Sequence, residues 1–202
     1  MGHRGRKAYS ADISAGSLML PESRRVAELL LATPDQDAWV RAIEQDNILQ
    51  KNSPESARRQ ARLIRKRLEQ LDEEGWRLIA EGEREVALQI LLAAAIKHSH
   101  LLDDFMREVV ASHVRRMEDV VSPRDWESFL EDCAQRDASV GGWSKTTKAK
   151  LFQVILRILA EARYLQSTRS AKLTLPLLHP EVLRYLHGRS EATVLAAMEP
   201  KS

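Results

Sequence analysis

The feature that most constrains this fold is a helix-start signal that occurs three times in the chain. Each copy places a serine or threonine directly before a proline, at residues 33–36, 53–55 and 122–125. The hydroxyl can cap the first free N–H groups of a helix, and proline fits the first helical position, where no N–H donor is needed. Only 8 Gly and 7 Pro occur in 202 residues, so few breaks interrupt the segments between these starts. The pattern predicts an all-α protein.

We expect a compact multi-helix bundle of about 8–10 helices, given the usual length of helices in globular proteins. Residues 86–96 are the most apolar stretch and continue toward Val114, with a kink or break near His98, so they form the expected core helix. Residues 171–178 alternate loosely and allow at most one short hairpin. We expect an N-terminal lobe over residues 1–75 and a C-terminal bundle over residues 76–202, or a single domain. The further predicted helices cover residues 21–33, 34–47, 53–71, 122–130, 145–166, 180–188 and 192–198, with a short helical piece around residues 76–79.

Composition excludes several classes of protein. Hydrophobic residues make up 44% and charged residues 30% of the chain, a balance typical of a folded soluble protein. The longest apolar run, residues 90–96, is far shorter than the ~20 residues that a membrane span needs. Residues 1–7 are basic and lead into polar sequence, which does not resemble a secretory leader. The single cysteine, Cys133, excludes an internal disulfide and a cysteine zinc cluster, so we expect a cytoplasmic protein without a membrane span.

The helix predicted over residues 53–71 is divided into an apolar stripe and a basic face. At 100° per residue, the apolar side chains fall on one narrow stripe, which we expect to face the core: Ala57, Ala61, Ile64, Leu68 and Leu71. The basic side chains fall on a contiguous arc roughly opposite: Arg58, Arg59, Arg62, Arg65 and Lys66. Four arginines on one face repel one another unless an anionic partner lies across them.

Local carboxylates neutralise this face only in part. Glu55 can reach Arg58 and Glu69 can reach Arg65, but Arg62 has no carboxylate three or four residues away. Because the planar guanidinium matches phosphate and the edge of guanine, the face predicts contact with nucleic acid. The alternative is a solvated face, paired with the acidic segment at residues 72–85.

The surroundings of this helix support a nucleic-acid contact. Two predicted helices precede it, as in a helix-turn-helix motif, although the linker is longer than a tight turn. A second basic group begins another predicted helix at residues 145–150, where a phosphate would offset the unfavourable position of lysine near a helix N-terminus. A tolerated cost at an exposed surface is the alternative there. The predicted nucleic-acid-binding residues are Lys51, Ser53, Arg58, Arg59, Arg62, Arg65, Lys66, Lys145 and Lys148.

The sequence gives little support for a catalytic function. His100 and Asp104 can share a helix face, but the apolar surroundings favour packing or capping over a metal site. Cys133 lies among carboxylates, which disfavour its thiolate. No glycine-rich phosphate loop or nucleophile motif occurs, so we expect no catalysis, cofactor, metal or small-molecule substrate. Aromatic residues make up only 5% of the chain and none lies within residues 53–71, which argues against single-strand recognition by base stacking.

Several stretches together resemble the BrxA family, small proteins encoded in BREX bacteriophage-resistance systems. These are residues 9–11, 47–51, 53–68 (SPESARRQARLIRKRL), 93–105 (AAAIKHSHLLDDF) and 179–186. The resemblance implies an all-helical, non-enzymatic protein that binds double-stranded DNA and acts beside other BREX proteins, including a methyltransferase and an ATPase. It also implies a likeness to the helical antitermination factor NusB. A non-catalytic protein-interaction subunit and an RNA-binding helical protein remain the alternatives.

Overall fold

The computed structural model describes residues 8–200 and contains no strand within that range. The α-helices are α1 (Leu20–Leu31), α2 (Gln36–Val40), α3 (Pro54–Leu68), α4 (Glu73–Ala80), α5 (Arg84–His98), α6 (His100–Asp104), α7 (Ala111–Arg116), α8 (Pro123–Arg136), α9 (Lys145–Glu161), α10 (Pro180–Gly188) and α11 (Ala192–Met198). Shorter helical segments are η1 (Asp12–Ala15), η2 (Arg41–Gln45), η3 (Phe105–Val110) and η4 (Ala138–Val140), of which η2 and η3 are π-helical. Because α6, η3 and α7 follow one another without a break, the described residues form ten continuous helices, apart from the short segments η1 and η4. The predicted all-α bundle is confirmed.

Two of the three predicted helix starts are confirmed. Ser53 accepts a hydrogen bond from the N–H of Ser56 at the start of α3, and Ser122 forms a full capping box at the start of α8. The prediction that Thr33 caps the second helix was wrong. Thr33 takes a left-handed backbone conformation (φ 47°), and the side chain of Asp35 caps α2 instead. The short polar side chain nearer to the helix supplies the acceptor.

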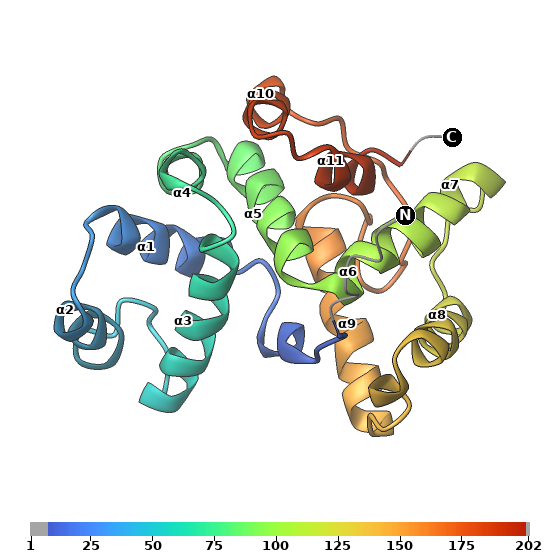
Figure 1. Cartoon of the computed structure of the whole chain (residues 1–202), viewed down its shortest axis with the longest axis horizontal. Coiled ribbons are helices and arrows are strands. Elements are labelled where there is room, and N and C mark those ends of the chain that lie inside the picture. The colour runs from blue at the N-terminus through green and yellow to red at the C-terminus, as the bar shows by residue number, and fades with distance from the viewer. Residues whose placement is uncertain (1–7, 201–202) are drawn as a thin grey trace, which may run out of the picture.

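Helix α5 is the central core helix, as its all-round apolar sequence predicts. Every residue from 86 to 96 is buried, including Gln89, whose amide bonds the backbone of residues 177 and 179. The predicted break occurs at Ser99, which leaves the helical conformation and caps α6. Figure 1 shows α5 running through the middle of the molecule, with α1 to α4 on one side and α7 to α9 on the other. Helices α10 and α11 pack against α5 and close the top of this view.

Residues 171–178 do not form the hairpin that their alternation allowed. Lys172 and Leu173 make only isolated bridges, to Val120 and Leu165 respectively. Pro176 has no N–H to donate to a ladder, and Leu177 is 90% exposed, so the alternation does not create one buried face.

No helix among residues 8–200 is long and apolar enough to cross a membrane. The basic residues 1–7, which we judged unlike a secretory leader, lie outside the described range. One hydrophobic cluster includes buried residues from both predicted lobes, and the division at residues 75 and 76 stays a prediction.

Candidate nucleic-acid interface

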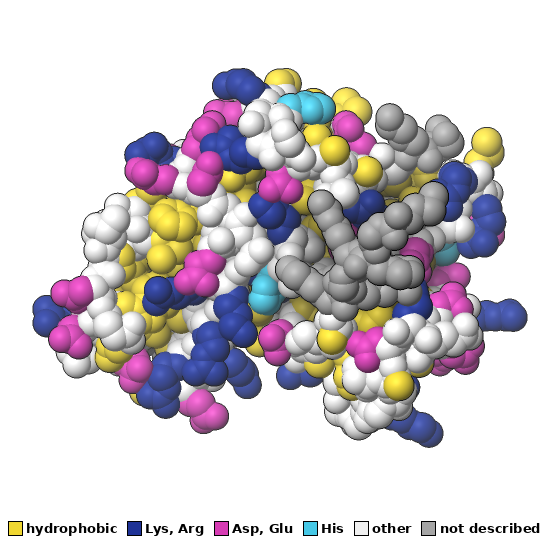
Figure 2. Space-filling view, in the orientation of Figure 1, with side chains coloured by type: hydrophobic (Ala, Val, Ile, Leu, Met, Phe, Trp, Pro, Cys, Tyr) yellow, Lys and Arg dark blue, Asp and Glu magenta, His cyan; other side chains and the backbone are white. Residues whose placement is uncertain are grey.

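Helix α3 presents its arginines as the sequence predicts. The apolar stripe is buried, and Arg58, Arg59, Arg62 and Lys66 are exposed on the opposite arc, with Arg65 half-exposed beside them. Figure 2 shows Lys and Arg side chains gathered over α3, at the lower left of the view. The predicted face is therefore continuous in space as well as on the helical wheel.

Three side chains of this face form ion pairs, all of them solvent-exposed. Arg58 pairs with Glu44 of η2 (2.8 Å), Arg65 with Glu69 (2.9 Å) and Lys66 with Asp12 of η1 (3.6 Å). The pair of Arg65 with Glu69 was expected from the sequence. Arg58 was expected to pair with Glu55 but pairs with Glu44, which the packing of η2 against α3 brings near. Such exposed pairs contribute only ~0–1 kcal/mol each, so an anionic ligand can compete with them.

Arg59 and Arg62 have no ion-pair partner among residues 8–200. Arg62 is the residue for which the sequence already offered no carboxylate. Both guanidinium groups are free to bind an external anion with their planar donor fork.

The acidic segment at residues 72–85 does not neutralise the arginine face. Asp72 and Glu74 both pair with Arg189, at the end of α10, and Glu73 pairs with Arg77. The pKa of Asp72 lies below its ordinary value: partial burial raises it, but hydrogen bonds from Arg189 and from the backbone of Gly75 lower it more. The carboxylates at residues 72–74, which were the alternative partners of the α3 arginines, therefore pair with arginines of α4 and of the end of α10.

One arginine of α3, Arg67, is buried in the interior. Arg67 is only 3% exposed and donates hydrogen bonds to the backbone carbonyls of Ser17 and Gly16, the latter at 3.0 Å. Burial lowers the pKa of Arg67 to about 10, with partial compensation from the charge of Glu161. Glu161 in turn accepts hydrogen bonds from the hydroxyl of Ser17 and the N–H of Leu18, so one polar network joins α3 to α9.

The two predicted site residues before α3 already have partners within the protein. The hydroxyl of Ser53 is occupied by the helix cap, and Lys51 forms an ion pair with Glu22 of α1. The side chains of Lys51 and Glu22 are about four-fifths buried, which makes this pair less accessible than those on α3.

Lys145 and Lys148 lie at the start of α9, on the other side of α5 from α3. Ser144 caps this helix by accepting from the N–H of Thr147 (3.1 Å). The starts of α3 and α9 both lie toward the lower edge of Figure 1, well apart from each other. Both lysines also line a groove of about 560 Å³ between α8 and α9, whose apolar floor includes Trp126 and Phe152.

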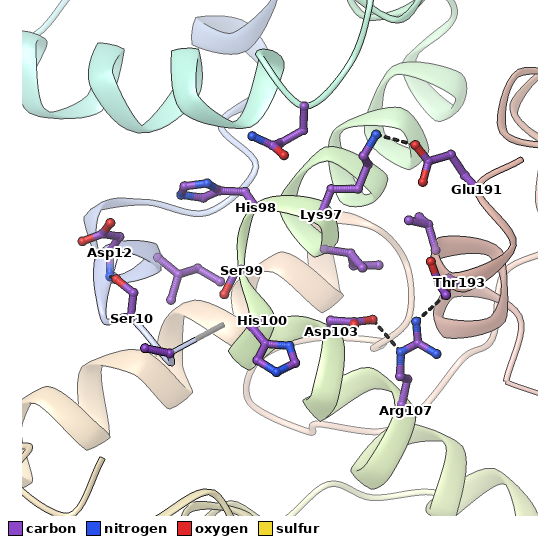
Figure 3. Close-up of a pocket in the computed structure, with 15 residues that line it drawn as sticks. Ser10, Asp12, Lys97, His98, Ser99, His100, Asp103, Arg107, Glu191 and Thr193 are labelled. Atoms are coloured by element: carbon purple, nitrogen blue, oxygen red, sulfur yellow. Dashed lines mark hydrogen bonds and ion pairs between the residues drawn. The ribbon is translucent and has the colours of Figure 1, made fainter. Parts of the chain in front are cut away.

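Two potential ligands for a metal ion, His100 and Asp103, line another cavity, of about 380 Å³, between the N-terminal segment, α6 and α11 (Figure 3). One ligand atom each from His100, Asp103 and Asp104 lie within 4.8 Å of one another. Each carboxylate already binds a cation, since Asp103 accepts from Arg107 (2.7 Å) and Asp104 lies 3.4 Å from Arg136. These guanidinium groups compete with a metal for the same oxygens.

Cys133 is buried, and the sequence had suggested an inert thiol. Burial raises the pKa of Cys133 to about 11, and the carboxylates of Glu108 and Asp104 act in the same direction, against the hydroxyl of Tyr9 and the charge of Arg136. A thiol with this pKa is almost entirely protonated at neutral pH.

The fold and this surface define an all-helical protein with an exposed cationic helix face. Comparison with known proteins identifies the family: the model of the BrxA family matches residues 7–190, and the chain belongs to it. A protein of Paramagnetospirillum magneticum named BREX protein BrxA is 40% identical over 191 residues, which cover 95% of this chain and 96% of that one. A protein of Escherichia coli O9:H4 with the same name is 35% identical, covering 96% of this chain and 92% of its own.

A solved structure has the same fold. The crystal structure of an uncharacterized protein from Magnetospirillum magneticum superposes with a TM-score of 0.89 at 38% sequence identity. The match covers 96% of this chain and all of the other.

Proposed function

We propose that this protein is a non-catalytic, DNA-binding accessory component of a BREX phage-defence system. The membership in the BrxA family and the names of the relatives support the assignment to a BREX system. The observation that carries DNA binding is the exposed arginine face of α3, on which Arg59 and Arg62 have no ion-pair partner among the described residues.

In the proposed complex, α3 lies along duplex DNA and its arginines bind phosphate oxygens. The preceding helices α1 and α2 support a helix-turn-helix interpretation, in which the first residues of α3 approach the base edges. Lys51 and Ser53 flank that end, and Lys145 and Lys148 supply a second contact at the start of α9. Phosphate contacts release counterions, so binding should weaken steeply with salt.

The test is a salt-titrated binding measurement with the double variant Arg58→Ala/Arg62→Ala. We expect the slope of log K against log salt to become shallower by about 2, because each lost phosphate contact changes it by ~0.9. Arg115→Ala is the matched control: it removes an exposed guanidinium on α7, which lies away from α3. If the double variant keeps the wild-type affinity for duplex DNA at low salt, the assignment is wrong.

A second candidate is a protein-interaction subunit of the defence complex. The groove between α8 and α9 favours it, because Trp126, Leu130 and Phe152 line an open apolar cavity there. Capture of other BREX proteins that survives Arg58→Ala/Arg62→Ala but is lost in Phe152→Asp would support this role. Loss of capture in the arginine variant alone would count against it.

A further inference from the structure

A small groove separates α2 and η2 from the arginine face of α3. Its volume is about 270 Å³, and its lining includes the buried side chains of Ile43 and Ala61. Three arginines of α3, spaced four and three residues apart along one face, form the opposite rim: Arg58, Arg62 and Arg65. The groove therefore combines an apolar floor with a cationic edge.

Trp39 of α2 forms an aromatic wall in this groove. The guanidinium carbon of Arg65 lies over its ring, 4.6 Å from the ring centroid, and the Nε of Arg65 donates to Glu69 (2.9 Å). The ring and the carboxylate together fix the position of the guanidinium. The sequence places no aromatic residue within α3, but the packing of α2 brings Trp39 onto its arginine face.

We propose that this groove binds one unpaired nucleobase of DNA adjoining the duplex held by the arginine face. The inference rests on the proposed function, because it assigns the base to the same DNA. A nucleobase stacks on aromatic rings and on guanidinium planes, and both are present in the Trp39–Arg65 pair. Arg62, which has no ion-pair partner among residues 8–200, lies on the rim where the phosphate of that nucleotide would follow.

A paired base cannot use this site. Both faces of a base within a duplex are covered by its neighbours, so only a base that has left the stack can lie against Trp39 and Arg65. The groove thus favours DNA in which duplex and single strand meet, and the blunt duplex engages only the arginine face.

The test compares three DNAs of equal duplex length in their binding to the full chain. One is blunt, one carries a short single-stranded overhang, and one carries an abasic overhang with the same phosphates and no bases. We expect the base-bearing overhang to bind at least about fivefold tighter than the abasic one, which corresponds to ~1 kcal/mol, the lower end of base–aromatic stacking. Charge alone cannot produce this difference, because the two overhangs carry equal numbers of phosphates.

Substitutions of Trp39 and Arg65 test whether the preference for the base-bearing overhang arises in this groove. Trp39→Leu should abolish the preference for the base-bearing overhang and leave affinity for the blunt duplex within twofold, whereas Trp39→Phe should retain most of it. Arg65→Lys keeps the charge but removes the planar group, so it should also lose the preference. Trp143→Leu, at a half-buried tryptophan before α9, is the matched control and should behave as wild type. Circular dichroism establishes that each variant is folded.

The outcomes separate this inference from the proposed function. Equal affinity for all three DNAs, or a preference that survives Trp39→Leu in the folded protein, overturns the unpaired-base site and leaves duplex binding intact. Binding to the base-bearing overhang without binding to blunt duplex upholds the site and refutes the duplex contact. Failure to bind any of the three overturns both.

Discussion

Arg67 should be the arginine of α3 on which folding depends. The proposed variant is Arg67→Met, because an unbranched apolar side chain keeps most of the buried volume and removes the donors. In the wild type, the guanidinium donates to the carbonyls of Gly16 and Ser17, while its Nε has no hydrogen-bond partner among the described residues. The variant leaves those two carbonyls without their donors.

The expected magnitude follows from these two acceptors. A buried acceptor left unsatisfied costs ~1–3 kcal/mol. The bond to Ser17 is buried and the bond to Gly16 is partly buried, so the two lost bonds together would cost up to ~6 kcal/mol. The loss of the charged group offsets part of this cost. Burial disfavours the charged guanidinium and lowers the pKa of Arg67 to about 10, and the variant no longer buries that charge. We expect the free energy of unfolding to fall by ~2–4 kcal/mol, and Tm by roughly 5–15 °C for a chain of this size.

Urea unfolding, monitored by circular dichroism, measures this difference as a shift of the unfolding midpoint. An unchanged slope m would show that the variant and the wild type expose the same surface on unfolding. Arg62→Met is the matched control, because it makes the same substitution on the exposed face and should change stability by no more than ~0.5 kcal/mol. Equal unfolding midpoints for the two variants would refute the structural role of Arg67. A midpoint higher than wild type would show that the desolvation cost outweighs the two hydrogen bonds.

Three further predictions concern other parts of the fold. Gly75→Ala should destabilise the protein by ~1–3 kcal/mol in thermal unfolding, because a Cβ there would lie 2.5 Å from the hydroxyl oxygen of Tyr185; a neutral effect would mean that the ring moves aside. Asp72→Asn should destabilise most above pH ~5, with the difference disappearing as pH falls below ~3.9 toward the depressed folded pKa; a pH-independent loss would exclude the ion pair with Arg189 as its cause. Cys133 should react with iodoacetamide at pH 7.5 only after unfolding, since burial raises its pKa to about 11; rapid labelling of the folded protein would contradict this.

Much of the local structure was predictable from the sequence because its causes are local. The cap at Ser53, the proline after it and the apolar stripe at 100° per residue together set where α3 begins and which side is buried. The basic arc follows from the same spacing. Thr33 shows the limit of such signals: two residues that can cap a helix stood close together, and the backbone conformation at Thr33 left Asp35 as the cap.

The candidate site was predictable only as a charged helix face. Which carboxylates neutralise it depends on elements distant in the sequence, so Arg58 pairs with Glu44 and not with its helical neighbour Glu55. The acidic segment after α3, a plausible partner by proximity in the chain, is instead held by Arg189.

The sequence alone determined that this chain is helical, that α5 forms its core and that α3 carries a cationic face. Only the tertiary structure decided that Arg67 is interior and that Trp39 lies against Arg65. The physical reason is that helical periodicity sets the angle at which a side chain leaves its own helix. What that side chain meets depends on which other segments pack there, and those contacts join residues far apart in the chain.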